Sequence, residues 1–151
     1  MLKSCFFIGH HNAPPDIRKA LVEAIERHIT DYGVGEFVVG HYGAFDRMVA
    51  SQLLLAKGRH PEIVLTLLSP YHPGERAIKF PEDFDRSFYP PGMETVPRQI
   101  AIVRANQYMV QNTDYLICFN RGYVGNTREL VDLARKQAEK GRMHIENLAG
   151  E

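Results

Sequence analysis

Short apolar runs that alternate with amphipathic segments constrain the fold of this sequence most strongly. Five runs have the length and composition of buried strands: residues 2–8, 36–39, 62–68, 114–119 and 142–146. Runs that are apolar on both faces are typical of a parallel sheet covered by helices. The pattern therefore predicts an α/β three-layer fold, with a mostly parallel sheet of about five strands and helices on both faces.

Four further segments have the spacing of apolar residues that a helix requires. They cover residues 17–29, 46–57, 97–111 and 127–140. In the first of them the apolar residues recur with the 3.6-residue period of one helix face. Because strand and helix signals alternate along the whole chain, we expect a single domain over residues 1–151, with right-handed crossovers.

Residues 69–96 interrupt the alternation. This stretch holds five prolines, two glycines and several aromatic residues. So long a loop is uncommon inside a compact domain and is usually functional or disordered. Its aromatic residues argue against simple disorder. We expect it to form a lid or a wall of the functional site.

Composition restricts the classes of partner. Lys plus Arg and Asp plus Glu number 18 each, so the formal net charge is zero. A neutral protein has little general attraction to nucleic acid or to an anionic membrane, and we expect neither as a partner. Cys5 and Cys118 lie in apolar runs, which indicates buried free thiols. The chain has no Cys/His metal spacing, and we expect no metal or cofactor.

The chain also lacks the apolar segments that membranes require. No run approaches the ~20 apolar residues of a membrane span, and the first residues do not form the apolar core of a signal peptide. We therefore expect a cytoplasmic protein.

Polar and glycine-containing loops follow three of the predicted strands, which end at Gly9, Gly40 and Asn120. In an open α/β sheet, ligands bind outside the carboxyl ends of the strands. Four segments should meet at that edge. They are residues 9–11, residues 40–46, the long loop together with Arg98 and Arg104, and residues 122–129.

The stretch RGYVGNTRE at 121–129 has two interpretations. Glycines let a backbone approach a ligand closely, and amides at a helix N-terminus bind anions, so the stretch suits a phosphate and sugar site. Alternatively, Asn126 or Thr127 caps the helix that follows. Glu129 falls in the first helical turn, where a carboxylate suits the helix dipole. It can equally serve as a catalytic acid or as an acceptor for a sugar hydroxyl.

Other polar residues near this edge leave similar alternatives. His10 and His11 are either a solvated pair in a turn or include one ligand contact. Asp46 either caps the second helix or binds a ribose hydroxyl. Arg98 and Arg104 are six residues apart and do not share a helix face. We expect one to be solvated and the other to hold a phosphate with its planar guanidinium.

Several common motifs are absent. The first loop is neither a P-loop nor a G-x-G-x-x-G turn, and no G-x-S-x-G elbow occurs. These absences count against ATPases, dehydrogenases of the usual type and α/β-hydrolases.

Three segments in order resemble the SLOG superfamily, a Rossmann-like group that includes the LOG phosphoribohydrolases and DNA processing protein A. The segments are CFFIGHHN, GHYGAFDRMVA, and RANQYMVQNTDYLICF followed by GYVGNTRE. They span nearly the whole chain, which looks closest to the small stand-alone bacterial members. The resemblance implies a Rossmann-like fold, a nucleotide-type ligand and assembly into a homo-oligomer.

The resemblance also suggests catalytic residues. In LOG enzymes a Gly-Gly-x-Gly-Thr-x-x-Glu loop grips the phosphate of a nucleoside monophosphate. Its Glu acts with an Arg of the preceding helix on the N-glycosidic bond. Glu129 and Arg104 match those positions. Tyr123 replaces a glycine of the doublet and Asn126 stands where the Thr would be, and these departures favour binding over catalysis.

The sequence thus predicts that a nucleotide or nucleotide-derived ligand binds at the carboxyl ends of the strands, in a sensor or binding module. The alternative is a LOG-like hydrolase or transferase with Glu129 and Arg104 as catalytic residues, so whether the protein is an enzyme stays open. The predicted ligand-binding residues are Gly9, His10, Gly40, Gly43, Phe45, Asp46, Arg98, Gly122, Gly125, Asn126 and Thr127.

Overall fold

The computed structural model describes residues 2–72 and 84–150. Its centre is one sheet whose strand pairs are all parallel, in the order β4-β3-β2-β1-β5-β6. The strands are β1 (Lys3–Gly9), β2 (Val34–Val39), β3 (Val64–Leu68), β4 (Arg86–Phe88), β5 (Tyr115–Phe119) and β6 (His144–Asn147). The helices are α1 (Arg18–Thr30), α2 (Ala44–Arg59), α3 (Ala101–Asn112) and α4 (Asn126–Glu139), with short 3-10 turns at Pro15–Ile17, Met93–Thr95 and Arg98–Ile100.

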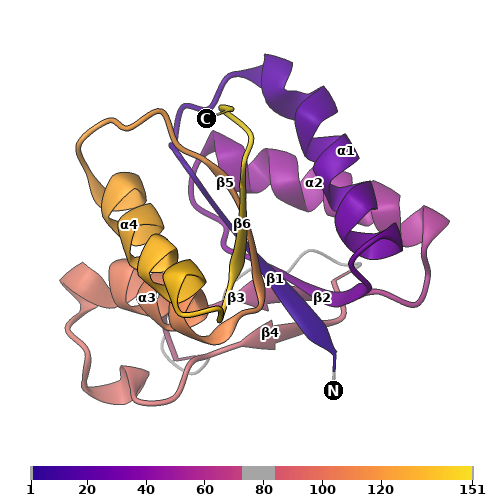
Figure 1. The fold of residues 1–151 in the computed structure, drawn as a ribbon. Coiled ribbons are helices and arrows are strands. Elements are labelled where there is room, and N and C mark those ends of the chain that lie inside the picture. Colours follow the sequence, from indigo (N-terminus) through magenta and orange to yellow (C-terminus); the bar gives the residue numbers. More distant parts are fainter. Residues whose placement is uncertain (1, 73–83, 151) are drawn as a thin grey trace.

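The sheet separates two apolar cores. Successive residues of a strand point to opposite faces. Cys5 and Phe7 of β1 therefore pack with α1 and α2, whereas Phe6 and Ile8 pack with α3 and α4. Figure 1 shows the two helix pairs on opposite sides of the sheet. The predicted α/β three-layer, Rossmann-like architecture is confirmed, with six parallel strands where about five were expected.

The order of the strands reverses next to β1. From β1 the chain adds β2, β3 and β4 on one side, and it then returns through α3 to place β5 and β6 on the other side. β1 and β5 run parallel, with Gly9 opposite Phe119 at their carboxyl ends. The loops after β1 and β5 therefore diverge toward opposite faces of the sheet and leave a crevice between them.

One strand lies where the sequence predicted only a loop. Arg86–Phe88 forms β4 and pairs with Thr66–Leu68 of β3. Asp85 fixes this edge, because its carboxylate accepts a hydrogen bond from Leu65 N at 2.7 Å and its own N–H donates to Leu65 O at 2.9 Å. A three-residue edge strand has no periodicity that a sequence pattern can reveal. Residues 73–83 of the predicted lid, including Phe80, lie outside the described residues.

Two helix boundaries also differ from the predictions. α3 begins at Ala101 rather than Pro97, because residues 98–100 form a 3-10 turn that carries Arg98. The second helix was predicted over residues 46–57, whereas α2 runs from Ala44 to Arg59 and His60 is its C-cap. Helix ends are the least certain part of any pattern-based assignment.

Cys5 and Cys118 are buried free thiols, as the apolar runs predicted. Burial raises the pKa of the Cys5 thiol above its usual value. Among the described residues, no helix combines the length and the apolar character that crossing a membrane requires.

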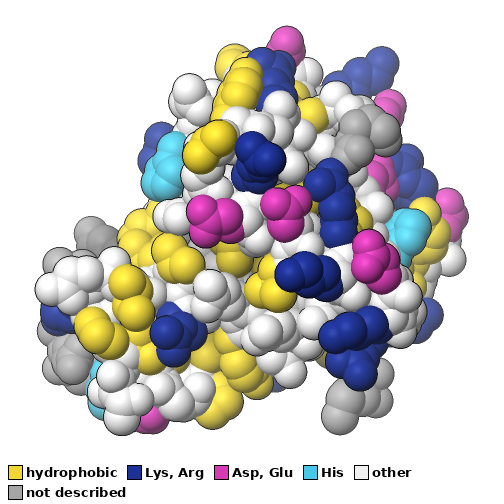
Figure 2. Space-filling model, turned by 60° about the vertical axis from the view of Figure 1, so that its left-hand side comes forward, with side chains coloured by type: hydrophobic (Ala, Val, Ile, Leu, Met, Phe, Trp, Pro, Cys, Tyr) yellow, Lys and Arg dark blue, Asp and Glu magenta, His cyan; other side chains and the backbone are white. Residues whose placement is uncertain are grey.

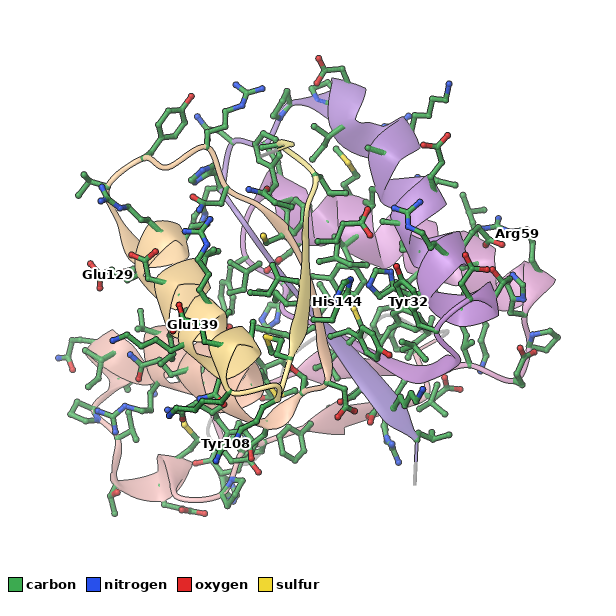
Figure 3. All side chains as sticks on the ribbon, viewed as in Figure 1. Tyr32, Arg59, Tyr108, Glu129, Glu139 and His144 are labelled. Carbon is green, nitrogen blue, oxygen red and sulfur yellow. The ribbon has the colours of Figure 1, made fainter. Side chains whose placement is uncertain are left out.

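A buried histidine sits beneath a group of aromatic rings at the amino end of β5. The Nδ1 atom of His28 lies 2.7 Å from Ala24 O, which makes Nδ1 the donor and leaves Nε2 unprotonated. Within the described part of the chain, Nε2 has no hydrogen-bond partner. The rings of Tyr32 and Tyr115 meet His28 edge-on, with centroids at 4.9 and 5.5 Å. Figure 3 shows Tyr32 and His144 close together in this region.

His28 should make folding sensitive to acid. Burial lowers the pKa of His28 below its usual value, with a smaller opposing effect from Ala24 O. The unfolded chain therefore takes up the proton first as pH falls below about 6.5, and stability that is full above that pH is lost toward the lower folded-state pKa. At pH about 7.5 we expect His28→Leu to cost about 1 kcal/mol through the lost hydrogen bond.

Urea unfolding of both proteins at several pH values checks this expectation. The stability advantage of wild type over His28→Leu should shrink as pH falls to about 5. An advantage that stays constant over this range would show that His28 does not become harder to protonate on folding.

Candidate functional site

A cavity of about 290 Å³ opens at the carboxyl ends of β1 and β2, beside the start of α4. It is bordered by the loops after these strands, by one side of α3 and by the loop after β5. Seven of the predicted ligand-binding residues line it: Gly9, His10, Gly40, Asp46, Gly125, Asn126 and Thr127. These seven residues come from three separate segments of the chain, and Ile102, Val103 and Asn106 of α3 form the fourth wall.

Two of the predicted residues, Gly43 and Phe45, pack against residues of the first loop that line the cavity. Phe45 is buried against Gly9, where a Cβ atom would lie 2.4 Å from the Phe45 ring. Gly43 has φ +95° and packs against His11, whose carbonyl accepts a hydrogen bond from Ala44 N at 2.8 Å. These contacts hold the first two loops against each other. Gly43 and Phe45 do not line the cavity itself.

Asp46 lies in the first turn of α2 and lines the cavity. Its Oδ2 accepts a hydrogen bond from Tyr42 N at 3.0 Å and lies against Gly40, where a Cβ atom would be 3.0 Å away. Burial raises the pKa of Asp46 to about 6, against the lowering effect of the Tyr42 hydrogen bond. The carboxyl group therefore ties the loop after β2 to the helix, and it changes charge near neutral pH.

His10 is held in one orientation. Its Nε2 accepts a hydrogen bond from Arg121 N at 3.1 Å, which links the loop after β1 to the loop after β5. The His10 ring lies edge-on to Phe119 and tilted against Tyr123, with centroids at 5.8 and 5.0 Å. Burial, and secondarily the positive charge of Arg121, lowers the pKa of His10. The neutral ring is therefore favoured at physiological pH.

The loop between β5 and α4 is anchored by amide side chains. Gly122 N donates to Asn120 Oδ1 at 3.0 Å, while Asn147 bonds both N and O of Asn120 at 3.0 and 2.9 Å. Gly122 has φ +82°, a conformation that favours glycine. These bonds explain how a loop with little apolar content keeps one path.

The start of α4 has no side-chain cap. Its N-cap is Gly125, with φ +145°, and neither Asn126 nor Thr127 takes the capping position. Thr127 Oγ1 instead donates to Gly9 O at 3.3 Å and draws α4 toward the end of β1. The positive end of the helix dipole lies at this cavity wall, where an anion is stabilised.

The remaining predicted residues lie away from the cavity. Glu129 is exposed and lines a different, shallow hollow with Gln107 and Lys136, and Figure 3 shows it on the outer side of α4. Arg104 is exposed on α3. The guanidinium of Arg98 lies 5.1 Å from the Tyr71 ring centroid. The two predicted catalytic residues are not brought into the cavity, and no hydrogen bond or ion pair joins them among the described residues.

Several cavity residues were not predicted as ligand contacts from the sequence. Tyr42, Asn106 and Tyr123 all line the cavity. Asn106 shares a helix face with Ile102 and Val103, at spacings of four and three residues, and a polar residue on an apolar face is a usable signal. Tyr123 stands where the resemblance called for glycine. This departure from the LOG motif was the sequence feature that could have indicated Tyr123 as a ligand contact.

Comparison with known proteins gives one informative likeness. The chain matches no family model and no curated protein sequence. Its fold is similar to that of DNA processing protein A from Helicobacter pylori, in a structure that describes how that protein binds single-stranded DNA. The TM-score is 0.56 at 13% sequence identity, and the match covers 95% of this chain and 74% of that one. At so low an identity the likeness establishes a shared Rossmann-like fold.

This likeness corrects two expectations drawn from the sequence. Nucleic acid was not expected as a partner, yet the similar structure belongs to a protein that binds single-stranded DNA. The predicted nucleotide sensor or LOG-like hydrolase is likewise contradicted by that neighbour. The physical reason for the error is that zero net charge describes the whole chain, whereas binding depends on the charges near one site.

Gly9 should tolerate no side chain. In Gly9→Ala the added Cβ would overlap the buried Phe45 ring, so we expect a loss of about 1–3 kcal/mol of stability through overpacking. Gly58→Ala is the matched control, because a Cβ at this helical position meets nothing within 4 Å. It should stabilise by about 0.5–1 kcal/mol. Urea unfolding measures both, and an unaffected Gly9→Ala variant would contradict the described contact.

Asp46→Asn should reveal the raised pKa of the carboxyl group. Because folding raises this pKa, the contribution of Asp46 is full below its unfolded value and is lost as pH rises through about 6. Asparagine keeps an acceptor for Tyr42 N without the charge. We expect the variant to gain stability relative to wild type as pH rises from about 4 to about 6, and the difference to stay constant at higher pH. A pH-independent difference in unfolding free energy would show that Asp46 titrates normally.

Proposed function

We propose that the protein binds single-stranded DNA at the cavity on the carboxyl edge of its sheet. The observation that carries the proposal is Tyr123, an exposed aromatic residue beside His10 at a cavity that also contains the start of α4. Proteins that bind single strands combine a surface that follows the phosphates with aromatic rings on which bases stack. Here the aromatic ring and the phosphate-binding helix start lie within five residues, 123–127, at the end of the loop and the start of α4.

The helix start supplies the phosphate contact. α4 begins in the cavity wall without a side-chain cap, and Gly125 leaves its backbone accessible, since a Cβ there would meet nothing within 4 Å. Backbone amides at such a helix end bind a phosphate oxygen well. The side chains of Asn12 and Asn106 add neutral hydrogen-bonding groups to the cavity wall.

The aromatic pair supplies the base contact. Tyr123 is 56% exposed, so its ring is accessible to a base from solvent. The Tyr123 ring is supported by His10, whose orientation the Arg121 amide fixes. A base stacked on such a ring gains about 1–3 kcal/mol, whatever its identity. Binding with little sequence preference follows.

The likeness to DNA processing protein A supports this assignment at the level of fold, and the three sequence motifs support it at the level of family. We propose that residues 1–151 form a single domain of the SLOG superfamily, related to DNA processing protein A. The seven sequence-predicted residues that line the cavity are its proposed binding residues. Assembly into a homo-oligomer and a cytoplasmic location stay predictions from the sequence.

Tyr123→Ala tests the proposal. Loss of the stacking surface should weaken binding of a fluorescein-labelled oligo-dT by about 1–3 kcal/mol, which is about 5- to 150-fold in Kd. Tyr123→Phe keeps the ring and should bind within about twofold of wild type. Leu55→Ala, at an apolar residue of α2 that is 57% exposed and does not line the cavity, is the matched control and should bind as wild type does.

Fluorescence anisotropy at fixed salt gives the affinities of wild type and the three variants. Wild type that fails to bind oligo-dT at micromolar concentration would overturn the proposal. Equal losses in Tyr123→Ala and Leu55→Ala would show that the Tyr123 ring does not determine binding.

A further inference from the structure

We propose that a second site on the outer side of the same loop holds the phosphates of the strand where it leaves the cavity. This arginine hollow has a volume of about 470 Å³. Its lining residues are Asn120, Arg121, Gly122, Arg128, Asp132, Arg135, Ala149 and Gly150. The inference rests on the proposed binding of single-stranded DNA and extends it to a second segment of the strand.

The three arginines come from the loop before α4 and from α4 itself. They follow one another at seven-residue intervals, at positions 121, 128 and 135. Within α4, seven residues are close to two turns, so Arg128 and Arg135 lie on one side of the helix about 10 Å apart along its axis. Arg121 lies on the loop before the helix, and its guanidinium is 5.0 Å from the Phe119 ring centroid.

The described residues that line the hollow carry a positive charge, although the net charge of the whole chain is zero. They include three arginines and one aspartate, which gives 3 − 1 = +2. Asp132 Oδ1 and Arg135 Nη1 lie 3.3 Å apart, and the two side chains are 53% and 45% exposed. An exposed pair of this kind contributes little to stability, and it holds the Arg135 guanidinium beside Asp132 at the hollow. Figure 2 shows Lys and Arg mixed with Asp and Glu on the side bearing α3 and α4.

The hollow and the cavity share one wall. Tyr123 and Gly125 line the cavity, whereas Arg121 and Gly122 line the hollow. Thr127 faces the cavity, and the next residue, Arg128, belongs to the hollow. A strand with one nucleotide in the cavity therefore reaches the hollow by crossing the glycine-containing loop. A Cβ at Gly122 would project into open space, with nothing within 4 Å. Because glycine has no Cβ, the strand can pass close to the backbone of the loop at this point.

The chemistry of the hollow fits a sugar–phosphate backbone better than a base or a peptide. Among the described residues that line it, Ala149 has the one apolar side chain and none is aromatic. Bases and apolar peptide side chains would find no surface to pack against. Guanidinium groups pair with phosphate oxygens in a bidentate manner and stay charged at any physiological pH. The occupant is therefore the backbone of the strand, with its bases turned to solvent.

The test separates the two sites by the length of the DNA. Arg128→Gln/Arg135→Gln removes two guanidinium groups from the hollow, and Arg18→Gln/Lys19→Gln removes two exposed charges from α1 on the opposite face of the sheet as a matched control. Both proteins, wild type and Tyr123→Ala are titrated into labelled oligo-dT of about twelve nucleotides, the upper range of one binding module. A labelled trinucleotide serves as the short probe.

Salt dependence gives the expected size of the effect. Each phosphate contact of a single strand changes the slope of log K against log salt by about 0.7. Losing two contacts should lower the slope by about 1.4 and weaken binding of the long probe about 25-fold at ~0.1 M salt. Binding of the trinucleotide should change less than about twofold, whereas Tyr123→Ala should weaken both probes. Arg128→Lys/Arg135→Lys should restore most of the slope, because lysine keeps the charge.

The outcomes are distinguishable. If the arginine variant binds the long probe with the affinity and slope of wild type, the hollow holds no phosphate while the proposed function stands. If it loses affinity for the trinucleotide equally, the arginines act on the cavity and the second site is overturned. If wild type binds neither probe, both proposals fail. Equal melting temperatures of the variants and wild type exclude unfolding as the cause.

Discussion

The reversal of strand order between β1 and β5 is the constraint on which the rest of this structure depends. It sends the loop after β1 toward α1 and the loop after β5 toward α4, and no side chain has to hold the gap open. What the side chains must do is align the two loops. The bond from Arg121 N to His10 Nε2 and that from Thr127 Oγ1 to Gly9 O both cross this gap. The shape of the cavity therefore follows from topology, and its precise width follows from two polar contacts.

Much of the fold was readable from the sequence because burial leaves a strong pattern. Phe6 and Phe7 are both buried, one on each face of the sheet, and only a strand covered on both faces places adjacent aromatic residues in that way. β4 left no such pattern. Its pairing with β3 depends on the two hydrogen bonds between Asp85 and Leu65, which are tertiary contacts across twenty residues. A pattern within one segment cannot report a partner in another.

The sequence predicted cavity-lining residues correctly where their place depends on the backbone. It failed where the place depends on the direction of the side chain. Gly9, Gly40 and Gly125 reach the cavity because strand ends and helix starts meet there in any fold of this class. Glu129 follows Gly125 by four residues, about one helical turn, yet its side chain leaves α4 on the outer side. Spacing in a motif fixes the rotation of a residue about its own helix, but not the angle at which that helix meets the sheet.

Charge at the two proposed sites differs for a physical reason. The cavity contains Asp46, whose ionised form would repel a phosphate, and burial already favours the neutral acid up to pH about 6. A bound phosphate would favour it further, so the cavity can accept an anion only by keeping a proton on Asp46 or by holding the phosphate at the far wall, at the start of α4. Attraction at long range must then come from elsewhere. Arg121 lies on the loop after β5, and Arg128 and Arg135 lie on α4. All three are exposed, so their charges act on an approaching strand before any base can stack on Tyr123.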